Sequence, residues 1–325
     1  MSDEKSKATL LKEEIMMKGS KGVATLNAEE IKKADDFCVG YKKFLDHSPV
    51  EREAVSYTLE LAKKAGFTEY DENASYNAGD KVYYVNRDKA IALAVIGKNG
   101  VKNGARLAIA HIDSPRIDLK PNPLYEDTNL ALFKTHYYGG LKKYQWTALP
   151  LSLHGTVVKL DGTKVNITWG DDENESCFCV TDLLPHLAKD QVSKPLAKVF
   201  TGEDLNVLVG SRPYEDGNDE KDLVKLNVMS ILNKKYGIVE GDFLSAELCL
   251  IPSFKARDIG FDASMIGGYG HDDKVCAYPA VMASLDVETP EQTCVTYLTD
   301  KEETGSDGNT GMQLSLIHIS ECCLL

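Results

Sequence analysis

Residues 105–115 read ARLAIAHIDSP. The almost continuously apolar first half is typical of a central strand that is covered on both faces. His111 closes this run, and ligands in open α/β sheets gather at the carboxyl ends of strands. A metal-binding imidazole usually gives its other N–H to a carboxylate, a role that Asp113 could fill. Because a His-x-Asp pair alone is more often structural than functional, this stretch predicts an α/β sheet and suggests a site at its edge.

Helix signals precede this strand. Asn27-Ala28-Glu29-Glu30 has the pattern of a capping box, and apolar residues follow it at helical spacing. Ser48-Pro49-Val50-Glu51 predicts a second helix start with proline at the first helical position, and Gly66 is a plausible stop. Further predicted elements are strands at 81–86, 90–97 and 293–299 and a helix at 273–285.

The middle of the chain, residues 121–241, has a different character. Segments 151–159 and 163–169 alternate apolar and polar residues and are joined by Asp161-Gly162, a strong hairpin signal. Acidic loops separate the remaining segments. The order of elements therefore predicts an α/β domain that is interrupted by a β-rich module.

Composition excludes several classes of protein. The 325 residues are 43% hydrophobic and carry a net charge of −13, with a pI near 5.1. Such an acidic chain repels phosphate backbones, so we expect no nucleic-acid partner. It has no apolar run long enough for a membrane span and no secretory signal at its start, so we expect a cytoplasmic protein. Its eight cysteines lack CxxC pairs and are interpreted as reduced thiols.

Two further clusters could carry chemistry. Gly267–Lys274 reads GGYGHDDK and places Asp272 and Asp273 at a helix start, where acidic pairs often serve only as caps. Residues 300–306 read DKEETGS and place Glu302 and Glu303 directly after the predicted strand 293–299. Adjacent glutamates there could divide labour, one binding a metal and one taking a proton from water. With His111 they form three clusters at three element ends, with ligands that suit zinc, manganese or cobalt.

The order and spacing of these motifs resemble the aspartyl aminopeptidase family of di-zinc exopeptidases. The resemblance covers residues 5–313 and is supported by Tyr138-Gly139-Gly140, Trp146, residues 149–155 and Pro185-His186-Leu187-Ala188. It implies a mixed-sheet α/β catalytic domain with an inserted β-rich dimerisation domain, and dimers that assemble into dodecamers. It also implies removal of N-terminal residues from peptides by metal-activated water.

Roles for individual residues follow from the resemblance alone. It implies that His111 binds one zinc ion, that Asp272 bridges two, and that Glu303 binds the second. It implies that Glu302 is the general base and that Asp113 orients His111. Two further implications are a part for His186 in substrate handling, across a subunit contact, and a cis peptide after Asp272. Pro279 within the following helix predicts a kink or a late helix start.

The sequence departs from the family at its end. Family members continue for well over a hundred residues beyond the Glu-Glu motif, and that part supplies another metal-ligating Asp and a last metal-ligating His. The stretch 314–325, LSLIHISECCLL, resembles translated sequencing-adapter text, and its alternative is an ordinary apolar C-terminal strand. The sequence therefore predicts an inactive fragment of a zinc aminopeptidase.

The predicted organisation has four parts. Residues 1–120 form the first part of the catalytic domain, 121–241 the β-rich insertion, 242–313 the second part of the catalytic domain, and 314–325 a non-native tail. Two other functions remain open from the residues alone. One is a non-catalytic oligomerisation or binding module, and the other is a related di-metal deacylase of small amides.

Overall fold

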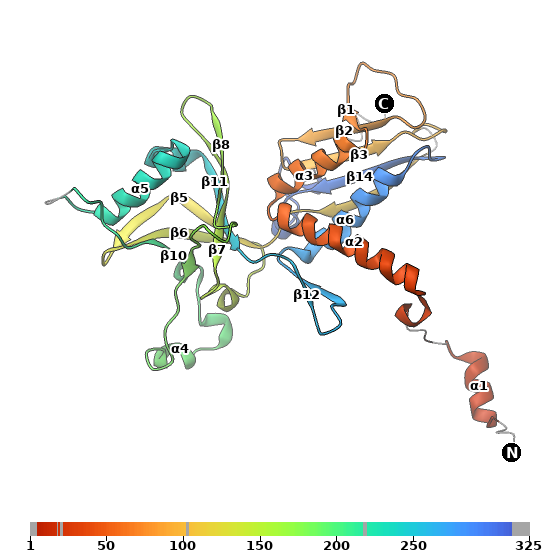
Figure 1. Cartoon of the computed structure of the whole chain (residues 1–325), viewed down its shortest axis with the longest axis horizontal. Helices are drawn as coiled ribbons and strands as arrows, with labels where there is room; N and C mark the ends of the chain where they lie inside the picture. Colours follow the sequence, from red (N-terminus) through yellow and green to blue (C-terminus); the bar gives the residue numbers. More distant parts are fainter. Residues whose placement is uncertain (1–4, 18, 20–21, 102–103, 217–219, 314–325) are drawn as a thin grey trace. The chain divides into compact units, whose positions relative to one another are not determined.

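A computed structural model describes residues 5–17, 19, 22–101, 104–216 and 220–313 (Figure 1). The predicted tail at 314–325 lies outside the described residues. The chain divides into two compact units, Met1–Tyr41 and Lys42–Leu325. Within the described ranges, none of the helices combines the length and the apolar character needed to cross a bilayer.

The first unit is helical. It contains α1 (Lys7–Ile15), the short 3-10 helix η1 (Gly22–Thr25) and most of α2 (Ala28–His47). The side chain of Asn27 accepts the backbone N–H groups of Glu29 and Glu30 at 2.9 and 3.0 Å, and the Glu30 carboxylate accepts the N–H of Asn27 at 2.9 Å. This reciprocal capping satisfies donors that a helix start leaves unpaired, so the predicted capping box is confirmed.

A five-stranded mixed sheet is the first layer of the second unit. Its strand order is β1-β2-β3-β14-β4, and β14 runs antiparallel to β3 but parallel to β4. All six residues of β3 are buried, as expected for an apolar run in a central strand. The strands are β1 (Thr68–Glu69), β2 (Lys81–Asn86), β3 (Ala90–Val95), β4 (Ala105–His111) and β14 (Thr293–Thr299).

One expectation for this sheet is wrong. The run at 105–111 was expected to be a covered central strand, but β4 is the edge strand among the strands that the structure describes. Leu107 is 57% exposed and Ile109 is 38% exposed. The apolar pattern predicted burial because these side chains favour it. Among the described residues, however, no further strand covers this edge of the sheet.

Helices α3 (Glu51–Lys64) and α6 (His271–Asp286) pack against the five-stranded sheet (Figure 1). The predicted helix start at Ser48 is wrong, because α3 begins at Glu51 after Val50, which supplies no side-chain cap. Ser48 is instead fully buried in the turn between α2 and α3. In α6, Asp272 and Asp273 have non-helical backbone angles, so the regular helix starts late, one of the two outcomes that Pro279 predicted.

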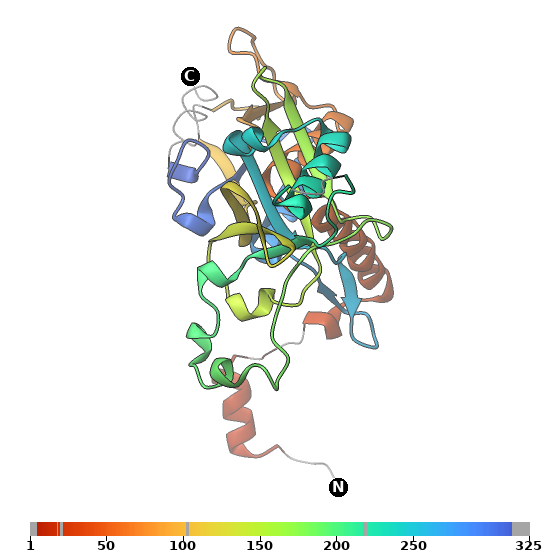
Figure 2. The same ribbon diagram turned by 90° about the vertical axis from the view of Figure 1, so that its left-hand side faces the viewer.

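The second large sheet of this unit has seven strands. Its order is β8-β7-β11-β5-β6-β10-β9, and every neighbouring pair is antiparallel. The β7–β8 hairpin lies beside β11, as Figure 2 shows, and confirms the turn predicted at Asp161-Gly162. The strands are β5 (Arg116–Asp127), β6 (Leu130–Tyr138), β7 (Leu151–Val158), β8 (Lys164–Trp169), β9 (Cys179–Val180), β10 (Val207–Gly210) and β11 (Ala246–Pro252).

Helix α5 (Leu223–Tyr236) covers this sheet and shares a core with it. Phe133, Leu153, Ile167 and Leu232 belong to this core, and burying each such side chain stabilises the fold by about 1.5–3 kcal/mol. The remaining elements are α4 (Lys189–Val192), the hairpin strands β12 (Arg257–Ile259) and β13 (Met265–Gly267), and the 3-10 helices η2 (Lys143–Trp146), η3 (Leu196–Lys198), η4 (Gly202–Asp204), η5 (Glu240–Ser245) and η6 (Glu302–Thr304).

The resulting architecture is the mixed α/β fold expected from the sequence. The seven-stranded sheet begins with Arg116 and ends with Pro252, somewhat outside the stretch 121–241 that was predicted as the insertion. The six cysteines that the structure describes are all free thiols.

Candidate active site

Three element ends bring the sequence-predicted residues together. His111 is the last residue of β4, Glu302 and Glu303 follow β14 in η6, and Asp272 lies at the start of α6. Because β4 and β14 are parallel neighbours with Thr299 opposite His111, their carboxyl ends meet at one edge of the sheet. Nε2 of His111 lies 3.1 Å from Oδ1 of Asp272 and 3.7 Å from Oε2 of Glu302.

Asp113 is the buried centre of this group. Its side chain is fully buried, and its carboxylate accepts the backbone N–H groups of Glu302 and Glu303, each at 3.2 Å. Nδ1 of His111 lies 3.0 Å from the backbone carbonyl of Asp113 and 3.3 Å from its carboxylate. Since these oxygens can only accept, Nδ1 carries a proton and Nε2 faces Asp272. The Asp113 carboxylate therefore contacts both His111 and the backbone of the Glu302–Glu303 pair.

The charges in the site shift several pKa values. Burial acts to lower the pKa of His111, but the hydrogen bond and charge of Asp113 outweigh it and raise that pKa to about 9. Burial opposes ionisation of Asp113, yet the hydrogen bonds from His111 and Tyr138 hold its pKa below the usual range. Burial and the nearby Asp113 carboxylate raise the pKa of Glu303. A cation between these groups would offset the repulsion among the carboxylates.

The backbone at Asp272 has an unusual form. The Asp272–Asp273 peptide bond is cis, as the resemblance implied, and the Asp272 side chain is 85% exposed. Its carbonyl lies 3.4 Å from the hydroxyl of Ser114, which accepts a 2.7 Å hydrogen bond from the fully buried ammonium of Lys274. Burial lowers the pKa of Lys274 to about 8. Ser114 and Lys274 thus link the loop after β4 to the start of α6.

His186 lies outside this group. It is exposed in the segment between β9 and α4, and among the described residues it makes no hydrogen bond or ion pair with His111, Asp272, Glu302 or Glu303. The predicted part for His186 in substrate handling is therefore not tested by the structure of one chain.

The donor set suits a zinc ion, although it is sparse. Imidazole nitrogen and carboxylate oxygen are zinc ligands, and Nδ1 of His111 is occupied in a way that leaves Nε2 available. Within the described ranges, no group of three or more His, Cys, Asp or Glu side chains is close enough together to hold a metal. Within this site, Nε2 of His111 and the Asp272 carboxylate are the two donors in contact, the Glu302 carboxylate lies 3.7 Å from the same Nε2, and Glu303 is near enough to interact with their charges.

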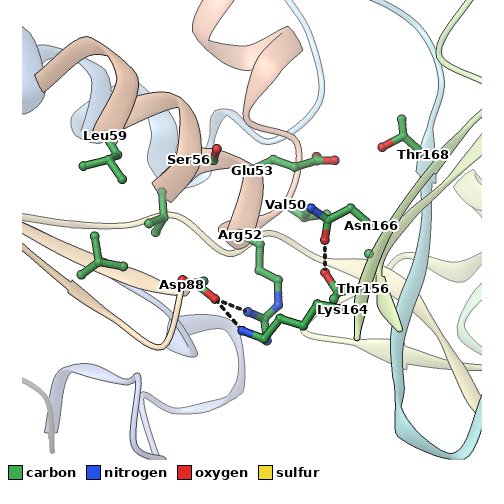
Figure 3. Close-up of a pocket in the computed structure, with 13 residues that line it drawn as sticks. Val50, Arg52, Glu53, Ser56, Leu59, Asp88, Thr156, Lys164, Asn166 and Thr168 are labelled. Carbon is green, nitrogen blue, oxygen red and sulfur yellow. Dashed lines mark hydrogen bonds and ion pairs between the residues drawn. The ribbon is translucent and has the colours of Figure 1, made fainter. Parts of the chain in front are cut away.

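A separate pocket of about 390 Å³ lies between α3 and the β7–β8 hairpin (Figure 3). At its rim, Arg52 and Lys164 both approach the carboxylate of Asp88, at 3.8 and 3.2 Å. None of His111, Asp272, Glu302 and Glu303 lines this pocket. The chemistry predicted from the sequence lies at the open edge of the sheet, so concavity alone does not locate it.

Sequence reasoning assigned no role to Tyr138 or to Lys274, although it quoted both within longer motifs. Tyr138 donates a 2.7 Å hydrogen bond to the carboxylate of Asp113 from the seven-stranded sheet. The only sequence signal was the Tyr138-Gly139-Gly140 motif, which supported the resemblance without a function. Gly139 has φ of +72°, and a Cβ at this position would lie 3.0 Å from the Glu303 side chain.

Comparisons with known proteins identify the family of this chain. A model of the family described as aminopeptidase I zinc metalloprotease (M18) matches residues 44–319. A probable M18 family aminopeptidase 1 from Clostridium acetobutylicum is 51% identical over 277 residues, which are 84% of this chain and 59% of the relative. One from Thermotoga maritima is 45% identical over 275 residues, covering 85% of this chain and 60% of the relative.

Solved structures of M18 aminopeptidases have the same fold as this chain. The crystal structure of aminopeptidase I from Clostridium acetobutylicum matches with a TM-score of 0.86 and 44% identity, over 93% of this chain and 67% of that one. The Thermotoga maritima M18 aminopeptidase matches with a TM-score of 0.87 and 41% identity, over 95% of this chain and 67% of that one. The chain spans about 59–63% of the length of the curated bacterial relatives it matches. With this fold, these element ends and these relatives, the chain belongs to the M18 family of zinc aminopeptidases.

Proposed function

We propose that this chain carries the zinc-binding and proton-transfer part of an aminopeptidase site that releases the N-terminal residue of a peptide. The observation that carries the proposal is the meeting of His111, Asp272 and the Glu302–Glu303 pair at the carboxyl ends of two parallel strands. An acyl-transfer site of this kind needs a cation, an adjacent base and fixed ligands. These residue types can supply the base and the ligands that would hold the cation.

Each side chain has a proposed part in the reaction. His111 would hold one zinc ion through Nε2, Asp272 would be shared between two ions, and Glu303 would hold the second. When bound, zinc stabilises negative charge that develops on the scissile carbonyl oxygen and makes a water molecule more acidic. Glu302 takes a proton from the attacking water at its carboxylate and then gives a proton to the departing amine nitrogen. Asp113 keeps the His111 ring in the orientation that presents Nε2.

We propose that the 325 residues alone bind zinc weakly. They offer His111 and Asp272 to one ion and Asp272 and Glu303 to the other, whereas a catalytic zinc usually has three protein ligands. Among the residues that the structure describes, no group of three or more His, Cys, Asp or Glu side chains could hold a metal ion. The 325-residue chain is therefore expected to have little or no peptidase activity by itself.

The proposal also concerns how the protein assembles and where it acts on its peptide substrates. A yeast relative of the same fold, at 19% identity, is described as a dodecamer. We propose that the β-rich part, residues 121–241, mediates association into dimers and larger particles in the cytoplasm. Leu183, Leu184 and Leu187 are 54%, 61% and 63% exposed around His186, and such exposed apolar side chains support an interface there. The part proposed for His186 in substrate handling across that interface comes from the resemblance.

A chromogenic amide assay tests the proposed function. Two proteins are compared: the 325-residue chain, and residues 1–313 fused to the C-terminal remainder of the Clostridium acetobutylicum relative. A panel of N-terminal residues, including leucyl and aspartyl amides, is offered with added zinc. We expect the fusion to cleave at least one amide and to lose activity with a chelator. A folded, zinc-loaded fusion that cleaves no amide on the panel would favour the non-catalytic module instead.

A further inference from the structure

Tyr138 connects the seven-stranded sheet to the candidate site. It is the last residue of β6 and is 8% exposed. Its hydroxyl donates a hydrogen bond of 2.7 Å to Oδ2 of Asp113. Burial and the neighbouring Asp113 carboxylate raise the pKa of Tyr138 above its ordinary value, so the hydroxyl keeps its proton and remains a donor.

The guanidinium of Arg116 lies over the ring of Tyr138. The two residues are directly opposed partners in the β5–β6 ladder, and the guanidinium carbon lies 4.1 Å from the ring centroid. Arg116 is itself buried and bonds to the carboxylates of Glu51 and Asp118, each at 2.7 Å. A stacked, doubly paired arginine has little freedom to move, so it limits where the Tyr138 ring can lie.

The Asp113 carboxylate has two oxygens with different partners. Oδ2 accepts from the Tyr138 hydroxyl and from the Glu303 N–H, while Oδ1 accepts from the Glu302 N–H and lies 3.3 Å from Nδ1 of His111. Rotation of the carboxylate would move all of these contacts together. The shortest of them is the one to Tyr138, which belongs to the seven-stranded sheet, whereas His111 ends a strand of the five-stranded sheet and Glu302 and Glu303 lie in η6.

We propose that Tyr138 is a positioning residue: by fixing the rotation of the Asp113 carboxylate, it sets the His111 ring and the Glu302–Glu303 turn. The effect of Tyr138 on zinc affinity rests on the proposed function, but its effect on the backbone at Glu302 and Glu303 does not. The seven-stranded sheet would then contribute to the site geometry as well as to the fold. Partners that orient metal-binding histidines affect metal affinity in this indirect way.

The test compares Tyr138→Phe with Tyr137→Phe in the 325-residue chain. Tyr137 is the preceding residue of the same strand, is 37% exposed and faces the other side of the sheet, so loss of its hydroxyl is a matched control. Amide hydrogen exchange is measured by mass spectrometry in the metal-free chain. In Tyr138→Phe we expect amides at 302–303 to exchange about tenfold faster, the change that loss of a typical hydrogen bond gives.

Exchange in the strands β3 and β14 is measured in the same experiment and should stay unchanged, because a purely structural loss would accelerate it as well. Equal exchange at 302–303 in wild type and both variants would overturn the proposal. So would an increase that extends uniformly through both strands.

A zinc titration by calorimetry forms the second arm, and it uses the fusion of residues 1–313 with the C-terminal remainder of the Clostridium acetobutylicum relative, because the 325-residue chain alone is expected to bind zinc weakly. We expect Tyr138→Phe to bind zinc about 10- to 100-fold more weakly than wild type, and Tyr137→Phe to match wild type. If the fusion without a substitution itself binds no zinc, the proposed function is contradicted, while the exchange arm still decides the role of Tyr138. Wild-type zinc affinity in Tyr138→Phe would overturn the role of Tyr138 in metal binding without affecting the proposed function.

Discussion

The Glu303 side chain packs against the backbone of Gly139: a Cβ on Gly139 would lie 3.0 Å from both Cβ and Oε2 of Glu303. Gly139 follows Tyr138 at the end of β6, so the same turn of the seven-stranded sheet contacts both Asp113 and Glu303. Gly139 has a φ of +72°, in the left-handed region, and residues with a side chain adopt this backbone conformation only at a cost in free energy.

Gly139→Ala should therefore weaken zinc binding and destabilise the chain. The left-handed backbone costs about 1 kcal/mol for alanine, and the added methyl displaces the Glu303 side chain. Gly140→Ala is the matched control, since nothing lies within 4 Å of a Cβ there. Calorimetric zinc titration and thermal unfolding measure both effects. Identical zinc affinity in Gly139→Ala and Gly140→Ala would argue against a metal-binding role for Glu303.

Glu302→Gln should abolish turnover without removing zinc. In the fusion that carries the C-terminal remainder of a relative, we expect kcat to fall by about a hundred- to ten-thousand-fold, because the amide cannot accept a proton. Metal analysis of the purified variant should give the wild-type zinc content. Near-normal kcat in the zinc-replete variant would show that another group is the general base.

His154 joins α3 to the seven-stranded sheet through two carboxylates. It is 1% exposed, and its ring nitrogens lie 2.9 Å from Glu53 and 3.2 Å from Asp171. Burial acts to lower the pKa of His154, but the hydrogen bonds and charges of Asp171 and Glu53 prevail and raise it to about 9. Burial opposes ionisation of Asp171, but the hydrogen bond from His154 lowers its pKa to about 2.

Stability should therefore depend on pH through His154. Because its folded pKa exceeds the unfolded value of about 6.5, its contribution is complete below about pH 6.5 and is lost as pH rises through about 9. The contribution is on the order of 3 kcal/mol. Urea unfolding of wild type and His154→Gln at pH 6 and pH 9.5 measures it. We expect a larger stability difference between the two proteins at pH 6, and an equal difference at both pH values would refute the assignment.

Leu187→Glu should reduce self-association. Leu187 is 63% exposed beside His186, in the segment for which an interface is proposed. A charge there would have to be desolvated on association, so we expect a smaller mass by light scattering. Leu160→Glu serves as control, because Leu160 is fully exposed at the tip of the β7–β8 hairpin. An unchanged mass for Leu187→Glu would place the interface elsewhere.

Local signals in the sequence predicted much of the fold. The capping box at Asn27 and the Asp161-Gly162 hairpin depend only on neighbouring residues, and both are present. The cap at Ser48 failed because that serine is buried in a turn, a tertiary effect that a local pattern does not contain. The apolar run at 105–111 predicted a strand correctly, but its edge position depends on which other strands are present.

The candidate site was predictable in part, because some of its features also depend on local sequence signals. His111, Asp272 and Glu302 occupy element ends, which sequence patterns indicate, and the parallel pairing of β4 and β14 then brings those ends together. Tyr138 was not predictable as a partner of Asp113, because the contact depends on how the two sheets pack. The roles assigned to the site residues remain predictions that come from the resemblance: His111, Asp113, Asp272, Glu302, Glu303 and His186.

Zinc anomalous diffraction from crystals of the 325-residue chain soaked in zinc tests the central claim most directly. The claim is that His111 and Asp272 are zinc ligands and that Glu302 and Glu303 border the ion. We predict an anomalous peak at ligand distance from Nε2 of His111 and the Asp272 carboxylate, and no such peak in His111→Ala crystals. Peaks confined to other parts of the molecule, with none at His111, would contradict the account.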